Sequence, residues 1–215
     1  MATPRRILVL LAHPVLERSR VNRRLADAIH GLEGVTLHDL YEHYPSGDLD
    51  VRYEQSLLLS NDVYVFQHPF YWYSVPSILK EWQDLVLEHG WAYGQKGTHL
   101  RGKITFNAIT TGGPTTVYRP EGRNRFTVRQ FLAPWDQTAV LCGMRYLAPF
   151  VVHGSFRLNN DDDVAPHAAA YRRVLEALRD HRFDLDRAQQ AQRLNDDLDA
   201  LITGEPPGAT GEASA

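Results

Sequence analysis

Short apolar runs alternate with amphipathic segments along most of this sequence. Residues 7–12 are continuously apolar, which is typical of a parallel strand that is covered on both faces. A polar loop follows, and residues 20–32 then carry apolar side chains along one helical stripe, with Ser19 where an N-cap residue is expected. The chain therefore opens with a strand, a loop and a helix.

The same alternation continues to about residue 181. Further strands are predicted over residues 35–40, 63–67, 103–109 and 146–152, and further helices over 51–59, 75–89, 127–141 (bent at Pro134) and 166–181. Strands that alternate with helices build a parallel sheet through right-handed crossovers. We therefore expect residues 1–183 to form one α/β domain with three layers and a five-stranded parallel sheet.

The remaining residues differ in character. Residues 184–203 are polar but place Leu194, Leu198, Leu201 and Ile202 at helical spacing. They predict a C-terminal helical extension that packs on the domain or on a partner chain, or else a solvated helix. Residues 204–215 are rich in Gly, Pro, Ala, Ser and Thr and predict a disordered tail.

Composition changes this picture little. With 215 residues and a formal net charge of −3, the chain gives no general reason to expect nucleic acid or an anionic membrane as partner, so any anion site must be local. No segment approaches the ~20 apolar residues of a membrane span, and the first apolar run is too short for a signal peptide. We expect a soluble, cytoplasmic protein. The single cysteine, Cys142, lies in an apolar run, which favours a buried structural thiol over a reactive one.

The loops after the first, third and fourth strands should meet at the carboxyl edge of the sheet, where ligands bind in such folds. The first loop, residues 12–22, leads into a helix N-terminus and carries Arg18 and Arg20, so it suits a phosphate group. The alternative is that Ser19 is only an N-cap and His13 only a loop residue. Neither a G-x-G-x-x-G after the first strand nor a P-loop motif is present, which disfavours a dinucleotide-type or NTPase site.

The other two loops add flat and flexible surfaces. Residues 68–76 contain four consecutive aromatic residues at 70–73, which indicate a planar ligand, a subunit interface or core packing. Residues 110–114 contain Gly112 and Gly113, which let a ligand approach the backbone closely, although a simple flexible turn is the alternative. The coincidence of a phosphate loop, an aromatic loop and a glycine-rich loop at one edge favours FMN, which has a phosphate tail and a flat ring.

A set of short motifs is specific when taken together. The motifs are Ala12-His13-Pro14 with Ser19 and Asn22, Gln67-His68-Pro69 with Trp72-Tyr73-Ser74, the segment His89–Gly94, Thr110-Thr111-Gly112-Gly113, and Cys142-Gly143. On these residues the chain, from about 5 to 181, resembles the quinone-reductase-like branch of the flavodoxin superfamily. It is most similar there to the ancillary proteins of glutathione-regulated potassium-efflux systems, which are flavin-dependent NAD(P)H:quinone reductases.

This resemblance implies a flavodoxin-like fold that binds FMN, or FAD in the same groove, and no metal. It implies NAD(P)H as hydride donor, a quinone-like molecule as acceptor, and a homodimer with each flavin near the subunit boundary. The residues that it places at the cofactor are His13, Ser19, Arg20, Val21, Asn22, Pro69, Phe70, Tyr71, Trp72, Tyr73, Thr110, Thr111, Gly112 and Gly113.

Tyr118 aligns with a tyrosine that this branch places over the flavin ring, which implies a role in hydride transfer or substrate positioning. Family members commonly carry a histidine a few residues further on, but here the stretch reads Gly122-Arg123-Asn124-Arg125. The two arginines either attract a phosphate of NADPH or an anionic substrate, or are solvated loop charges.

The first hypothesis for function is therefore an NAD(P)H dehydrogenase (quinone). The alternative is a regulatory ancillary subunit that docks on a potassium-efflux antiporter at the inner face of the cell membrane, with incidental reductase activity. A flavin electron carrier without substrate turnover is disfavoured, because a carrier has little use for the long loop that bears Tyr118.

Overall fold

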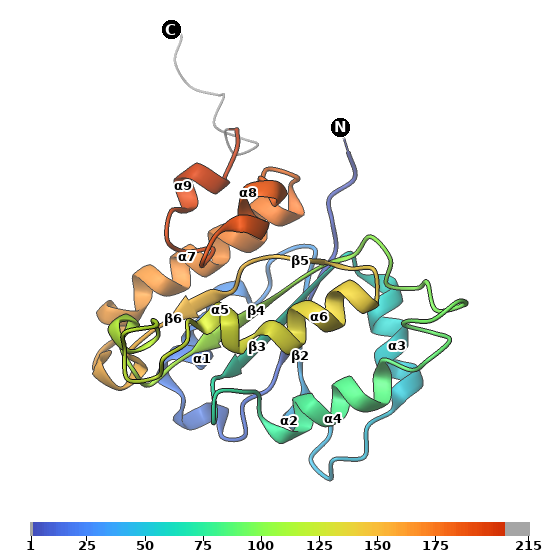
Figure 1. Ribbon diagram of the computed structural model, residues 1–215, viewed down its shortest axis with the longest axis horizontal. Coiled ribbons are helices and arrows are strands. Elements are labelled where there is room, and N and C mark those ends of the chain that lie inside the picture. The colour runs from blue at the N-terminus through green and yellow to red at the C-terminus, as the bar shows by residue number, and fades with distance from the viewer. Residues whose placement is uncertain (1, 205–215) are drawn as a thin grey trace, which may run out of the picture.

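A six-stranded sheet forms the centre of the protein in the computed structural model, which describes residues 2–204 (Figure 1). The strands are β1 (Ile7–Leu11), β2 (Val35–Asp39), β3 (Val63–Pro69), β4 (Ile104–Thr110), β5 (Arg145–Tyr146) and β6 (Phe150–Val152). All pairings are parallel, in the order β2-β1-β3-β4-β5, and β6 also pairs with β4. The expected α/β fold with a parallel sheet is confirmed.

Helices cover both faces of this sheet. The α-helices are α1 (Arg20–Ile29), α2 (Leu40–His43), α3 (Val51–Ser60), α4 (Ser77–Val86), α5 (Val128–Phe131), α6 (Ala133–Leu141), α7 (Asp161–Arg179), α8 (Leu185–Gln190) and α9 (Leu198–Leu201), and the 3-10 helices are η1 (Leu16–Arg18), η2 (Thr115–Val117) and η3 (Ser155–Arg157). Ile7 and Val9 of β1 pack with α1 and α7, whereas Leu8 and Leu10 share the opposite core with Trp82 of α4 and with α3 and α6. Because successive strand residues point to opposite faces, a continuous apolar run supplies both layers.

The last predicted strand, 146–152, is interrupted. Thr105 and Ala108 of β4 pair with Tyr146 and Phe150, respectively. The edge chain therefore has one more residue between its two paired positions than β4 has. Such an insertion is a β-bulge. Pro149 lies inside it and has no N–H to donate to the ladder, while its carbonyl accepts from the Leu194 N–H at 2.9 Å.

Two predicted helices differ from those observed. Residues 127–141 are divided into α5 and α6, because the chain turns at Leu132 and Pro134 stands in the first turn of α6. The sequence pattern predicts the last core helix from Pro166, but this helix begins at Asp161. Asn160 caps it: the Asn160 side chain accepts from the Asp163 N–H at 2.8 Å, and the Asp163 side chain accepts from the Asn160 N–H at 3.3 Å.

The chain beyond α7 folds back onto the edge of the sheet, where α8 and α9 lie beside α7 (Figure 1). Leu194, Leu198 and Leu201 are buried in the same core as α7, so this segment packs on the domain and is not a solvated helix. The Asn195 side chain accepts from the Val151 N–H at 3.0 Å and donates to the Val151 carbonyl at 2.9 Å. It thereby pairs with an edge strand as a neighbouring strand would. The tail predicted over 204–215 lies, from residue 205, outside the described residues.

Cys142 is a free, buried thiol whose pKa is raised by its burial, as expected of a structural cysteine. Among residues 2–204, no helix combines the length and the apolar character needed to cross a membrane.

Candidate active site

Loops at the carboxyl edge of the sheet enclose a cleft of about 970 Å³. Small-molecule sites typically have volumes of ~300–1,000 Å³. The cleft is lined by most of the residues that the sequence predicts at a cofactor: His13, Ser19, Arg20, Val21, Pro69, Phe70, Tyr71, Trp72, Thr110 and Gly112. The three predicted loops therefore converge on one space.

The start of α1 directs hydrogen-bond donors toward this cleft. The Ser19 hydroxyl accepts from the Asn22 N–H at 3.2 Å and so caps the helix. The backbone N–H groups of Arg20 and Val21 have no acceptor among the described residues. Arg18 and Arg20 line the same wall, and neither forms an ion pair within residues 2–204. This wall suits an anionic group.

His13 lies at the beginning of the same loop. Its Nδ1 accepts from the Val15 N–H at 3.2 Å, which leaves Nε2 as the protonated nitrogen of the neutral ring. Burial lowers the pKa of His13, an effect that the nearby Glu17 carboxylate opposes. The ring lies edge-on to Tyr71, with 6.3 Å between centroids. A neutral imidazole that can donate from Nε2 therefore stands beside the aromatic loop.

The aromatic loop is a tight turn with unusual backbone geometry. The Ser74 N–H donates to the Tyr71 carbonyl at 2.9 Å, and Trp72 and Tyr73 between them have φ values of +50° and +63°. Bulky residues rarely adopt this left-handed conformation, which costs roughly 1–3 kcal/mol per residue. Phe70 is buried, whereas the Trp72 side chain is 93% exposed. Of the three alternatives for this loop, core packing applies to Phe70 alone.

The glycine-rich loop forms the opposite wall. The backbone N–H groups of Gly112 and Gly113 have no acceptor in the described part of the chain. A Cβ built on Gly112 would stand 2.3 Å from a ring carbon of Phe156, so a larger residue there would require the exposed Phe156 ring to move. The loop thus brings two free donors and an open backbone surface to the edge of the cleft.

Asn22 and Thr111 do not line the cleft, because both are buried beneath it. The Asn22 side-chain amide donates to the Thr110 hydroxyl at 2.9 Å, and the Asn22 backbone carbonyl accepts from the Gln67 side-chain amide at 2.9 Å. The Thr111 hydroxyl donates to the Gly113 carbonyl at 2.9 Å. These contacts hold α1, β3 and β4 in fixed positions under the cleft.

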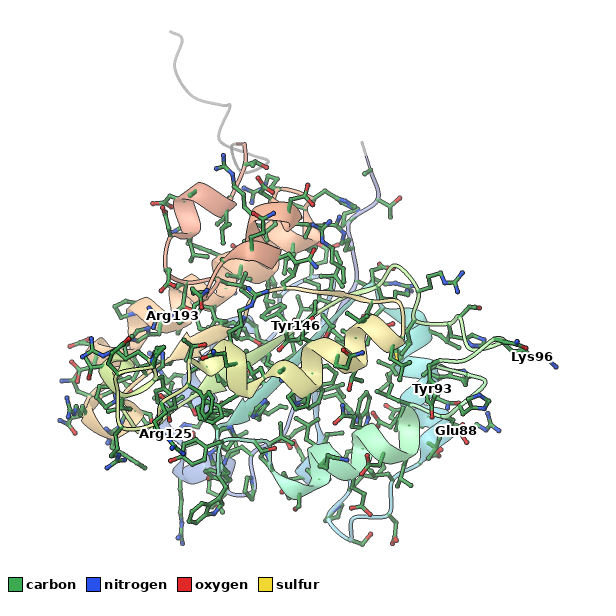
Figure 2. The ribbon with its side chains drawn as sticks, viewed as in Figure 1. Glu88, Tyr93, Lys96, Arg125, Tyr146 and Arg193 are labelled. Carbon is green, nitrogen blue, oxygen red and sulfur yellow. The ribbon has the colours of Figure 1, made fainter. Side chains whose placement is uncertain are left out.

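A second hollow of about 200 Å³ adjoins the cleft, and Phe70 and Trp72 line both. Tyr73, Gly113, Tyr118 and Arg123 complete its walls, together with Val117 and Asn124. Burial raises the pKa of Tyr118, so its hydroxyl stays protonated near neutral pH. Arg125, whose φ is +60°, does not line this hollow and projects from the same loop (Figure 2). Of the two arginines singled out in the sequence, Arg123 alone faces the space beside Tyr118.

Sequence reasoning missed the loop after β6. Ser155, Phe156 and Asn159 line the cleft. His153, in the same loop, has its ring 5.3 Å from that of Tyr118 and its Nδ1 2.9 Å from the Thr111 hydroxyl. An imidazole is therefore present near Tyr118, although it comes from a different segment than in the resembled family. The available signal was the strand itself, because parallel strands end at one edge and the loop after residue 152 belongs there too.

Residues 5–176 match the model of a family described as having a flavodoxin-like fold. The chain belongs to this family. The match covers the whole sheet and ends within α7, so it contains all the loops around the cleft.

Similar proteins agree with this assignment and confirm the resemblance found in the sequence. The chain is 44% identical to the glutathione-regulated potassium-efflux system ancillary protein KefG of Pectobacterium carotovorum. This alignment of 171 residues covers 80% of this chain and 93% of KefG. General stress protein 14 of Treponema denticola, solved in complex with FMN, is 38% identical with a TM-score of 0.75, over 80% of this chain and 99% of that one. An NADPH-quinone reductase of P. pentosaceus is 32% identical with a TM-score of 0.72, over 79% and 97% of the two chains.

Proposed function

We propose that this protein is a flavin-dependent NAD(P)H:quinone oxidoreductase that binds FMN in the cleft. The observation that carries the proposal is the convergence of three loops, one with free helical N–H groups, one aromatic and one glycine-rich, on a space of about 970 Å³. A phosphate tail, a flat ring and a polar ring edge require these three kinds of surface. The FMN complex of the Treponema protein and the name of the P. pentosaceus reductase support the same reading.

The residues of the cleft fit FMN group by group. The N–H groups of Arg20 and Val21, with the Ser19 hydroxyl and the Arg18 and Arg20 side chains, would hold the phosphate. The aromatic loop would hold the flavin ring on one side, and the N–H groups of Gly112 and Gly113 would donate to its polar edge. FAD is the alternative cofactor for the same groove.

A bound flavin accepts hydride from NAD(P)H and passes two electrons to a quinone. The chain's own residues orient these molecules and exclude water. In this proposal Tyr118 positions the substrate in the hollow of about 200 Å³, and its protonated hydroxyl donates a hydrogen bond to the quinone oxygen. The backbone donors of the glycine-rich loop favour negative charge on the reduced ring.

Purified protein should be yellow and release FMN on denaturation, and it should oxidise NAD(P)H faster when a simple quinone is added. Protein that takes up neither FMN nor FAD would contradict the proposal. The phosphate site can be tested by comparing FMN with riboflavin, which lacks the phosphate. Replacing Arg18 and Arg20 together by Gln should weaken FMN binding about tenfold and leave riboflavin binding nearly unchanged. Arg23→Gln is the control, because Arg23 is exposed on α1 and does not line the cleft.

A second candidate function is regulation of a potassium-efflux antiporter, in which the flavoprotein docks on the transporter from the cytoplasmic side. It is favoured by the 44% identity to a protein named as an ancillary component of such a system. Co-purification with an antiporter encoded beside this protein would support it. We also infer a homodimer in which the exposed Trp72 side chain lies near the subunit boundary, which light scattering of the flavin-loaded protein would test.

A further inference from the structure

A third hollow, of about 260 Å³, lies behind Tyr118. Two parts of the chain that are far apart in sequence build its walls. The loop after β4 and the start of α5 supply Thr115, Tyr118 and Arg129, and the C-terminal extension supplies Arg193 and Asp196. Tyr118 also lines the hollow beside the cleft, so the two spaces share this side chain.

Arg193 is held in place by two contacts. It pairs with Asp196 at 2.5 Å, and it donates to the Thr115 hydroxyl at 3.3 Å. A guanidinium group has five N–H donors, so Arg193 keeps donors for a ligand. Figure 2 shows Arg193 on the same side of the molecule as Arg125 of the loop after β4.

Arg129 is the second cation of this hollow. Its guanidinium donates to the carbonyls of Gln189 and Ala191, so the extension also holds this side chain. Among the described residues that line the hollow, Asp196 is the one acidic side chain. Two arginines against one aspartate leave an excess of one positive charge on groups that are already positioned.

His153 completes the wall between this hollow and the glycine-rich loop. Burial and the nearby Arg193 charge lower the pKa of His153 to about 4. The ring is therefore neutral near pH 7 and adds no charge of its own. The excess positive charge comes from the arginines.

We propose that this hollow is a subsite for an acidic substituent of the molecule that binds beside Tyr118, and that Arg193 recognises this substituent. The identity of that molecule rests on the proposed function, whereas the anion subsite itself does not. Arg193 lies beyond residues 5–176, which match the family. The C-terminal extension would therefore add selectivity for anionic ligands to a domain that has the fold of the family. The substituent belongs either to an acidic quinone or to the extra phosphate that distinguishes NADPH from NADH.

Titration calorimetry of the full chain loaded with FMN tests the subsite with two probes, 1,4-naphthoquinone-2-sulfonate and uncharged 1,4-naphthoquinone. Arg193→Gln should weaken sulfonate binding roughly tenfold and leave the uncharged quinone unaffected. Asp196→Asn removes the competing carboxylate and should strengthen sulfonate binding. Arg187→Gln is the control, because Arg187 lies on α8, pairs with Asp184 and does not line the hollow.

Opposite effects of Arg193→Gln and Asp196→Asn on sulfonate affinity would show that Arg193 recognises the anion and does not only stabilise the extension. If the Arg193–Asp196 pair only braced the extension, both variants would lose affinity for both probes, and that result would overturn the proposal. Steady-state KM values for NADPH and NADH identify the source of the anion: a rise for NADPH alone in Arg193→Gln, with sulfonate binding unchanged, assigns the subsite to the dinucleotide phosphate. No selective change with any anion would refute the subsite.

The proposed function can fail independently. If the protein oxidises neither NADH nor NADPH with any quinone, the reductase assignment is wrong. Sulfonate binding that is weakened by Arg193→Gln and strengthened by Asp196→Asn would still establish the anion subsite.

Discussion

The Tyr146 hydroxyl donates a hydrogen bond to the side-chain carbonyl of Asn107 at 2.6 Å, in the buried layer beside α6 (Figure 2). The Asn107 amide lies 3.1 Å from Nε2 of His68, and Nδ1 of His68 lies 3.0 Å from the Pro69 carbonyl. Because the amide can only donate, Nε2 accepts and Nδ1 carries the ring proton. An edge strand is thereby connected to the end of β3, which leads into the aromatic loop, through a chain of satisfied polar groups.

Replacing Tyr146 by Phe should lower the free energy of unfolding by about 1–3 kcal/mol, because the buried Asn107 carbonyl loses its donor. Tyr171→Phe is a matched control. Tyr171 is equally buried, but its hydroxyl has no partner among residues 2–204, so its removal should be neutral or stabilising. Urea unfolding of the flavin-free proteins measures both changes, and equal losses in the two variants would argue against the network.

His68 should make the fold sensitive to acid. Burial lowers the pKa of His68 to about 4, from 6.5 for an exposed histidine. As the pH falls through this range the unfolded chain binds the proton first, so stability is full above pH ~6.5 and declines toward pH ~4. Between pH 7.5 and pH 5 the expected loss from this residue is about 2 kcal/mol. His153, with a pKa also about 4, adds to it in the same direction.

A comparison of His68→Gln with His30→Gln tests whether His68 causes the loss of stability in acid, because His30 is exposed on the surface and serves as the control. Gln can both accept from Asn107 and donate to a carbonyl, so His68→Gln should fold and should lose less stability between pH 7.5 and pH 5 than the parent protein. Denaturant unfolding at both pH values is the measurement. An unchanged pH dependence in His68→Gln would assign the acid sensitivity to other groups.

We expect Trp72 to lower the stability of the flavin-free protein and to strengthen FMN binding. Asn adopts the left-handed conformation more easily than Trp, so Trp72→Asn should raise the free energy of unfolding of the flavin-free protein by up to about 1 kcal/mol. The same change removes an exposed aromatic ring from the cleft and should weaken FMN binding several-fold to tenfold. Trp72→Phe keeps both the strain and the stacking surface and should change neither quantity. Fluorescence titration with FMN and urea unfolding together test this trade-off.

The Thr110 hydroxyl accepts from the Asn22 side-chain amide, and we expect this hydrogen bond to hold the start of α1 against β4. Thr110→Val keeps the shape but leaves the buried Asn22 amide without its acceptor, which should cost about 1–2 kcal/mol of stability and weaken FMN binding. Thr36→Val on β2 is the control, because Thr36 is exposed. An FMN affinity that is unchanged in Thr110→Val would show that this contact does not shape the cleft.

Much of this architecture is determined by the sequence alone. Continuous apolar runs such as Ile7–Leu11 must be covered on both faces, and their alternation with helical stripes leaves a parallel α/β sheet as the consistent solution. Such a sheet gathers the loops after its strands at one edge, so the order of strands and helices is enough to predict that the aromatic and glycine-rich loops lie together.

Contacts between distant segments were decided only by the tertiary structure. His153 lies beside Tyr118, Phe156 faces Gly112, and Arg193 reaches Thr115, each across a sequence separation that no local pattern records. The interruption at Pro149 likewise depends on the partner strand, since a bulge exists only relative to the ladder that it breaks. Local periodicity determines which residues are buried, because it reflects the geometry of one helix or strand. Which polar groups meet depends on how several elements pack at once, and that information is spread over the whole chain.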